Sequence, residues 1–251
     1  MPIPHLTVGQ GPHHVFCLHG WFGSQDGWGG FPRYLDQQAY SYHFVNYRGY
    51  GPRKAEAGAY TLEEIAADVL ALADELGVER FSLIGHSMGG AAVQRVLATA
   101  PERVVAMVGV APVGATPSAF DEAGHDLFYG AAQNRANRYG IVDFTTGNRN
   151  TPTWVNQVVD FSMANSTVES FADHLVAWAT PDFADEVTGK TLPVLAVVGE
   201  HDPALGEATV AGTWVPTYPN CRVAVIANAG HYPMDEAPVN LVTVIEAFLA
   251  E

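Results

Sequence analysis

Cysteine is scarce in this chain, with only Cys17 and Cys221 among 251 residues. So few thiols do not form a disulfide framework, and we interpret both as buried apolar side chains in or beside strands. Basic residues are scarce too, 12 against 27 acidic ones, which gives a formal net charge of −15. Such an excess repels phosphate backbones and anionic membranes. We therefore expect no nucleic-acid partner, no membrane partner, and neutral rather than polyanionic substrates.

Long apolar runs and ligand-binding signatures are also missing. No apolar run approaches the length of a membrane span, and residues 1–5 do not begin a signal sequence, so a cytoplasmic, soluble protein is expected. No Walker A or G-x-G-x-x-G pattern follows a strand, which leaves nucleotide binding without support. The pairs His13–His14 and His201–Asp202 lack the spacing of a metal site. We expect no cofactor and no metal, and the sequence leaves the oligomeric state open.

Short apolar segments alternate with helical patterns over most of the chain. The clearest helix spans residues 62–76, with a capping box of Thr61 and Glu64 before it and Gly77 after it. The alternation predicts an α/β domain, a doubly wound and mostly parallel sheet with helices on both faces. We expect strands at residues 3–8, 15–18, 42–47, 81–84, 104–110, 194–198 and 223–226, and further helices at 28–38, 88–100 and 239–250.

The strand–helix alternation stops between about residues 114 and 189. This stretch holds helix-like segments at 119–138, 153–163 and 167–177, many aromatic residues and no convincing strand. We therefore divide the chain into a core domain, residues 1–114 and 189–251, and a helical cap, residues 115–188. Such a cap could shape an apolar pocket, although most of its aromatic residues are expected to form its own small core.

Residues 85–89 (Gly-His-Ser-Met-Gly) follow an apolar strand and open a helix. They fit G-x-S-x-G, the pattern of a strained turn that exposes a nucleophilic serine. A serine hydroxyl is a weak nucleophile until it is held clear of its neighbours and faced with a base. The turn leaves no room for side chains at positions 85 and 89. Ser87 is thus the candidate nucleophile, and the backbone N–H of Met88, at a helix N-terminus, is a candidate oxyanion donor.

A histidine suited to act as the base follows the strand expected at residues 223–226. A short loop, residues 228–230, would present the imidazole of His231 at the carboxyl edge of the sheet. Imidazole groups titrate near neutral pH, which suits proton transfer between a serine and a leaving group. His231 is therefore the candidate general base.

Three signatures together resemble the α/β-hydrolase superfamily, and within it the carboxylesterase-like serine hydrolases with a helical cap. They are residues 19–23 (His-Gly-Trp-Phe-Gly), residues 85–89, and residues 229–231 (Ala-Gly-His). The order serine, acid, histidine along the chain is the one this family uses. The N-terminus departs from the family, because it is too short for the full leading hairpin. A sheet of seven strands, or one with an abbreviated edge, is therefore expected.

The resemblance implies roles for further residues. Asp202, in the loop after the strand at 194–198, would orient the imidazole, with Glu200 as its rival in the same loop. The loop at residues 111–113 offers no carboxylate as an alternative. Trp21 would supply the second oxyanion donor through its backbone N–H. Substrate-pocket positions are expected at His19, Phe22 and His86, and His19 would also hold its loop through side-chain hydrogen bonds.

The predicted reaction is hydrolysis of a carboxylic ester with a small or aromatic, neutral structure, through an acyl-enzyme on Ser87. A serine at this position disfavours the dehalogenase and epoxide-hydrolase branches, which use an aspartate. The same triad would also serve a lactonase, a carbon–carbon bond hydrolase, an acyltransferase or a perhydrolase. A ligand-binding protein of this fold without turnover is the alternative from another class, since fold alone does not decide function.

Overall fold

The computed structural model describes residues 3–251, so Met1 and Pro2, which belong to the stretch analysed for a signal sequence, lie outside it. Within the described residues one sheet of seven strands has the order β1-β3-β2-β4-β5-β6-β7. All neighbouring strands run parallel except β1, which pairs antiparallel with β3. This confirms the predicted mostly parallel α/β sheet. The strands are β1 (His5–Gly9), β2 (His13–Leu18), β3 (Tyr40–Val45), β4 (Phe81–His86), β5 (Val104–Val110), β6 (Val194–Gly199) and β7 (Cys221–Ile226).

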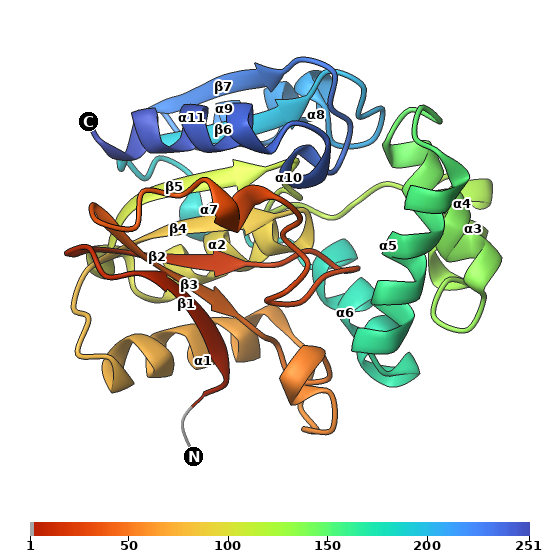
Figure 1. The fold of residues 1–251 in the computed structure, drawn as a ribbon, viewed down its shortest axis with the longest axis horizontal. Coiled ribbons are helices and arrows are strands. Elements are labelled where there is room, and N and C mark those ends of the chain that lie inside the picture. The colour runs from red at the N-terminus through yellow and green to blue at the C-terminus, as the bar shows by residue number, and fades with distance from the viewer. Residues whose placement is uncertain (1–2) are drawn as a thin grey trace.

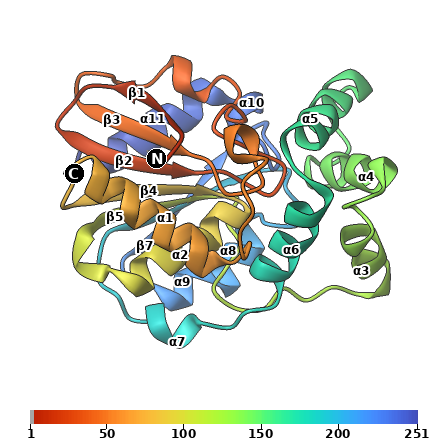
Figure 2. The same cartoon turned by 90° about the horizontal axis from the view of Figure 1, so that it is seen from below.

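Helices cover both faces of the sheet. In Figure 2, α1 (Leu62–Glu75) and α2 (Met88–Thr99) lie in front of the strands, and α11 (Pro238–Leu249) lies behind them. Every residue of β3, β4 and β6 is buried, as expected of strands covered on both faces. The remaining helices near the sheet are short, namely α7 (Ala184–Val187), α8 (Glu207–Gly212), α9 (Trp214–Thr217) and α10 (Pro233–Glu236).

Four helices of the inserted region gather beyond the carboxyl ends of the strands, at the right of Figure 1. Residues 119–138, expected as one helix, form two, because the chain turns after Gly130 and the Asn134 side chain caps the next helix by accepting from the Ala136 amide. The four helices are α3 (Glu122–Tyr129), α4 (Arg135–Thr145), α5 (Pro152–Asn165) and α6 (Val168–Ala179).

Two local expectations differ from the structure. The helix predicted at residues 28–38 is absent, and only a short 3-10 turn, Phe31–Arg33, forms there. At α1, Thr61 accepts a hydrogen bond from the Glu64 amide as predicted. The Glu64 carboxylate, however, accepts from the amides of Ala59 and Tyr60, so half of the expected capping box forms. Across residues 3–251, none of the helices has the length and apolar character needed to cross a membrane.

Candidate active site

Ser87 lies in a sharp turn between β4 and α2. Its φ of 54° falls in the left-handed region, which non-glycine residues rarely adopt. The turn is fastened by hydrogen bonds from the Ser87 amide to the Val110 carbonyl (3.0 Å) and from the Gly90 amide to the Ser87 carbonyl (2.7 Å). A Cβ at Gly85 would overlap the Gly89 carbonyl, and one at Gly89 would overlap the Leu18 carbonyl. Glycine is therefore required at both positions because a side chain would clash, as expected from the sequence.

His231 and Asp202 form a buried pair on two neighbouring loops. The His231 Nδ1–H donates to Asp202 Oδ2 at 2.7 Å, and both residues are 6% exposed. Asp202 Oδ1 accepts from the amides of Ala204 (2.9 Å) and Leu205 (3.0 Å). Burial alone would raise the pKa of Asp202, but the imidazole and these hydrogen bonds outweigh it and hold the pKa below its usual value. The carboxylate therefore stays charged beside the imidazole.

Glu200, the rival acid, faces elsewhere. Its carboxylate accepts a hydrogen bond from the Asn228 amide at 3.0 Å and lies 3.5 Å from the His201 imidazole. The hydrogen bond to the His231 imidazole is thus made by Asp202.

Ser87 and His231 line the same cavity. Within residues 3–251 no hydrogen bond joins these two side chains, and such bonds are often long before a substrate binds. His86, the residue before the serine, donates from Nε2 to the His231 carbonyl at 2.9 Å. Burial, followed by the nearby His231, lowers the pKa of His86 to about 3, so this ring is neutral. His86 thereby ties the histidine loop to the serine turn.

The loop with Trp21 runs beside the serine turn. A Cβ added to Gly20 would lie 3.1 Å from Ser87 Cβ, which shows how closely the two backbones approach. Among residues 3–251, no acceptor takes a hydrogen bond from the backbone N–H of Trp21 or of Met88. Neither N–H is therefore committed to an acceptor within the described residues, as an oxyanion donor requires.

Two of the three expected pocket residues line the cavity. Phe22 and His86 belong to its wall, whereas His19 does not. His19 is 1% exposed, stacks on Tyr47 with ring centroids 3.9 Å apart, and donates from Nδ1 to the Gly20 carbonyl at 2.8 Å. The expectation that His19 lines the pocket is therefore wrong. Its ring packs on Tyr47 and stabilises its own loop.

The cavity has a volume of about 1030 Å³ and lies between the core loops and the inserted helices. Its wall is largely apolar, but it contains three carboxylates that the sequence analysis did not single out, Asp26, Asp121 and Asp235. Among the described residues, no lysine or arginine lines it. Burial, with a contribution from Glu236, raises the pKa of Asp235 to about 6. The three carboxylates come from separate segments, since Asp26 lies in a loop, Asp121 caps α3 and Asp235 lies in α10, so no sequence motif could have grouped them.

Comparisons with known proteins agree with this architecture. The family described as alpha/beta hydrolase fold matches residues 13–238. The pimeloyl-[acyl-carrier protein] methyl ester esterase of Serratia marcescens is 25% identical over 254 residues, covering 97% of this chain and 96% of that protein. The dihydrolipoyllysine-residue acetyltransferase component of the acetoin cleaving system of Cupriavidus necator is 27% identical over 240 residues. That match covers 91% of this chain, which spans only 61% of the relative.

A similar solved structure is the bromoperoxidase from Bacillus anthracis, with a TM-score of 0.88 and 21% sequence identity. The match covers 98% of this chain and 95% of that one, and at this identity it shows the fold alone. The family match extends over most of the chain, from β2 to the start of α11. The chain therefore belongs to the alpha/beta hydrolase fold family.

Proposed function

We propose that the protein is a serine hydrolase that cleaves carboxylic esters through an acyl-enzyme on Ser87. The observation that carries the proposal is a cavity lined both by Ser87, which lies in a strained turn, and by His231, which is hydrogen-bonded to the buried Asp202 at 2.7 Å. The esterase name of the Serratia marcescens relative supports an ester as the substrate.

The proposed mechanism has two halves. Ser87 Oγ attacks the ester carbonyl carbon while His231 takes its proton, and the resulting oxyanion accepts from the amides of Trp21 and Met88. When this intermediate collapses, the carbon–oxygen bond to the alcohol breaks and His231 gives the proton to the leaving alcohol. Water, deprotonated by His231, then attacks the acyl carbon; the bond from this carbon to Ser87 Oγ breaks, the acid leaves, and His231 returns the proton to Oγ. Asp202 stays ionised and stabilises the imidazolium formed in each half.

The cavity wall supports a neutral substrate. Three carboxylates and no basic side chain among the described lining residues disfavour an ester that carries a negative charge near them. The apolar remainder of the wall, which includes Phe22, Phe128 and Trp178, suits a small aliphatic or aromatic group. A lactone, a carbon–carbon substrate or an acyl acceptor other than water would use the same three catalytic residues.

Turnover of a neutral aryl ester tests the proposal. Ser87→Ala removes the nucleophile, so kcat is expected to fall by at least about 10³-fold. Ser118→Ala is the matched control, because Ser118 also lines the cavity and should retain kcat within about three-fold. Near-normal hydrolysis by folded Ser87→Ala, or no turnover of any ester, lactone or diketone by the wild-type protein, would overturn the proposal.

Other sequence-based expectations stay proposals. They are a cap made of residues 115–188 on a core of 1–114 and 189–251, a cytoplasmic location, a small-molecule partner, and no nucleic-acid or membrane partner. Cell fractionation and binding assays on the purified protein would test the location and the partners.

A further inference from the structure

Trp21 is held from the core and from the inserted helices at once. The Tyr50 hydroxyl donates to the Trp21 carbonyl at 3.0 Å, and the Trp21 indole Nε1–H donates to the Phe171 carbonyl on α6 at 2.7 Å. The Trp21 and Phe171 rings stack with centroids 4.0 Å apart and planes 22° from parallel. These contacts hold the Trp21 ring and the peptide that follows it. The peptide that carries the Trp21 N–H is held at its other end, where the Gly20 carbonyl accepts from His19 Nδ1 at 2.8 Å and from the Gly23 amide at 2.9 Å.

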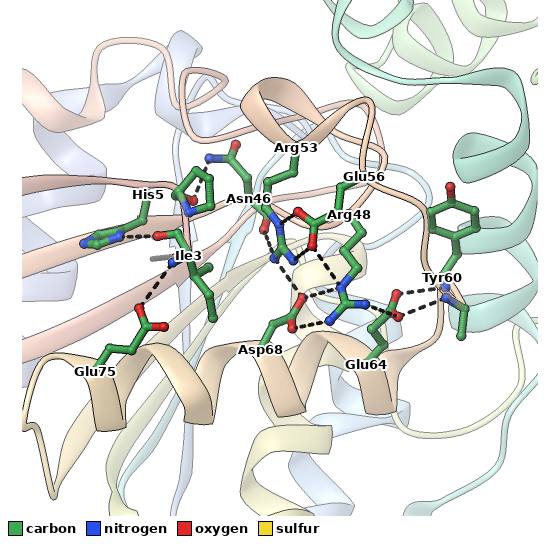
Figure 3. Close-up of polar contacts among 12 residues, drawn as sticks. Ile3, His5, Asn46, Arg48, Arg53, Glu56, Tyr60, Glu64, Asp68 and Glu75 are labelled. Atoms are coloured by element: carbon green, nitrogen blue, oxygen red, sulfur yellow. Dashed lines mark hydrogen bonds and ion pairs between the residues drawn. The ribbon is translucent and has the colours of Figure 1, made fainter. Parts of the chain in front are cut away.

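The core side of this arrangement is itself anchored. Tyr50 lies in the loop after β3, and Arg53 in the same loop reaches α1 (Figure 3). The Arg53 guanidinium donates to Asp68 at 2.7 Å and to both carboxylate oxygens of Glu56 at 2.7 Å. It also donates to the Asn46 carbonyl at 3.1 Å. These charge-assisted hydrogen bonds fix the loop, and with it the hydroxyl that holds the Trp21 carbonyl.

Among the inserted helices, a buried arginine lies over the Phe171 ring. Arg138 on α4 is 2% exposed, and its guanidinium carbon lies 3.5 Å from the centroid of the Phe171 ring. It donates only to neutral groups within residues 3–251, and burial lowers its pKa to about 10. These acceptors are the carbonyls of Ala131 and Ala132 and the hydroxyls of Ser162 and Ser166. The face of the Phe171 ring therefore supplies the negative potential that a carboxylate would otherwise give.

We propose that Phe171 and Arg138 are positioning residues for oxyanion stabilisation, acting through the Trp21 ring on the direction of the Trp21 backbone N–H. The inference rests on the proposed function, in which that N–H is a donor. The inserted helices also contact the loop that carries the catalytic histidine, because the His231 amide donates to the Thr145 carbonyl at the end of α4 at 3.2 Å. The inserted helices thus hold both catalytic loops as well as covering them.

The experiment uses Phe171→Leu and Arg138→Met in the full chain. Phe183 and Arg95 give a matched control pair, since Arg95 lies 4.1 Å over the Phe183 ring and neither residue lines the cavity. Phe171→Leu and Arg138→Met should each lower kcat on a neutral ester by about ten-fold with KM within about two-fold, because a tilted donor weakens transition-state binding more than ground-state binding. Affinity for a boronic acid that forms a tetrahedral adduct should fall by a similar factor. Phe183→Leu and Arg95→Met should change neither quantity.

The outcomes separate this inference from the proposed function. A wild-type protein that neither turns over esters nor binds the boronic acid contradicts the proposed function and the inference together. An active wild-type protein with unchanged kcat in folded Phe171→Leu, or with a rise in KM alone, overturns the inference only. If Phe171→Leu does not fold, Arg138→Lys decides, since it keeps the charge but loses the planar guanidinium over the ring. A kcat equal to wild type in that variant would also overturn the inference.

Discussion

Ser87 has a backbone conformation that costs a non-glycine residue about 1–3 kcal/mol, and its neighbours make that conformation possible. The motif predicted both glycines beside it, because their reason is local to the turn. His231 was predicted from its place after the last strand, and Asp202 from the resemblance to the α/β-hydrolase superfamily; the two side chains are joined at 2.7 Å. The hydrogen bond from His19 to its own loop was predicted. Its stacking on Tyr47 was not, because Tyr47 comes from the loop after β3.

At the same scale, Gly89→Ala should be costly. The added methyl would overlap the Leu18 carbonyl, so the start of α2 must shift, and we expect a loss of about 1–3 kcal/mol in the free energy of unfolding. kcat should fall with it, since the Met88 amide moves. Gly212→Ala is the control: a Cβ there meets no atom within 4 Å, and a helical alanine should be neutral or stabilising. Urea unfolding measures the stability of both variants. Equal midpoints for Gly89→Ala and Gly212→Ala would contradict the prediction.

At the scale of elements, the segments whose apolar pattern and end signals agree were predictable. The helix predicted at residues 62–76 forms at Leu62–Glu75, because its apolar face and its cap agree. At residues 28–38 the apolar side chains of Trp28, Phe31 and Leu35 have helical spacing and are buried, yet the chain forms a loop. Gly29, with a φ of +51°, breaks the helical backbone, and its missing Cβ leaves space for the Asp235 carboxylate. That contact with the far end of the chain could not be inferred from local sequence.

For the molecule as a whole, buried histidines predict acid sensitivity. Burial lowers their pKa below the ordinary value of 6.5, to about 3 for His19 and His86 and to about 4 for His43 and His174. At pH values between 6.5 and these lowered pKa values, the unfolded chain binds more protons than the folded chain. The stabilising contribution of the neutral rings is therefore complete above pH 6.5 and is lost as the pH falls. Each such histidine contributes up to about 1.4 kcal/mol per pH unit.

Urea midpoints measured from pH 7.5 to pH 5 should therefore decrease. His43→Gln should reduce the slope of stability against pH, whereas His125→Gln, at an exposed site, should leave it unchanged. A stability that is flat across this range would show that burial does not hold these rings neutral.

The charge distribution around the cavity predicts substrate preference. We compare aryl esters of equal length whose acyl chains end in a methyl group or a carboxylate. The anionic ester should have a kcat/KM about ten-fold lower, which corresponds to about 1.4 kcal/mol of repulsion. Asp235→Asn should narrow this difference, whereas Glu102→Gln, an equal charge change at an exposed site outside the cavity wall, should not. Equal rates for both esters in the wild-type protein would contradict the prediction.

The nucleophile itself is tested most directly by mass spectrometry of the protein quenched during turnover of an activated aryl ester. The account predicts one acyl group per chain, on the peptide that contains Ser87, and no adduct in Ser87→Ala. An acyl group on another residue, or the same adduct in Ser87→Ala, would contradict it.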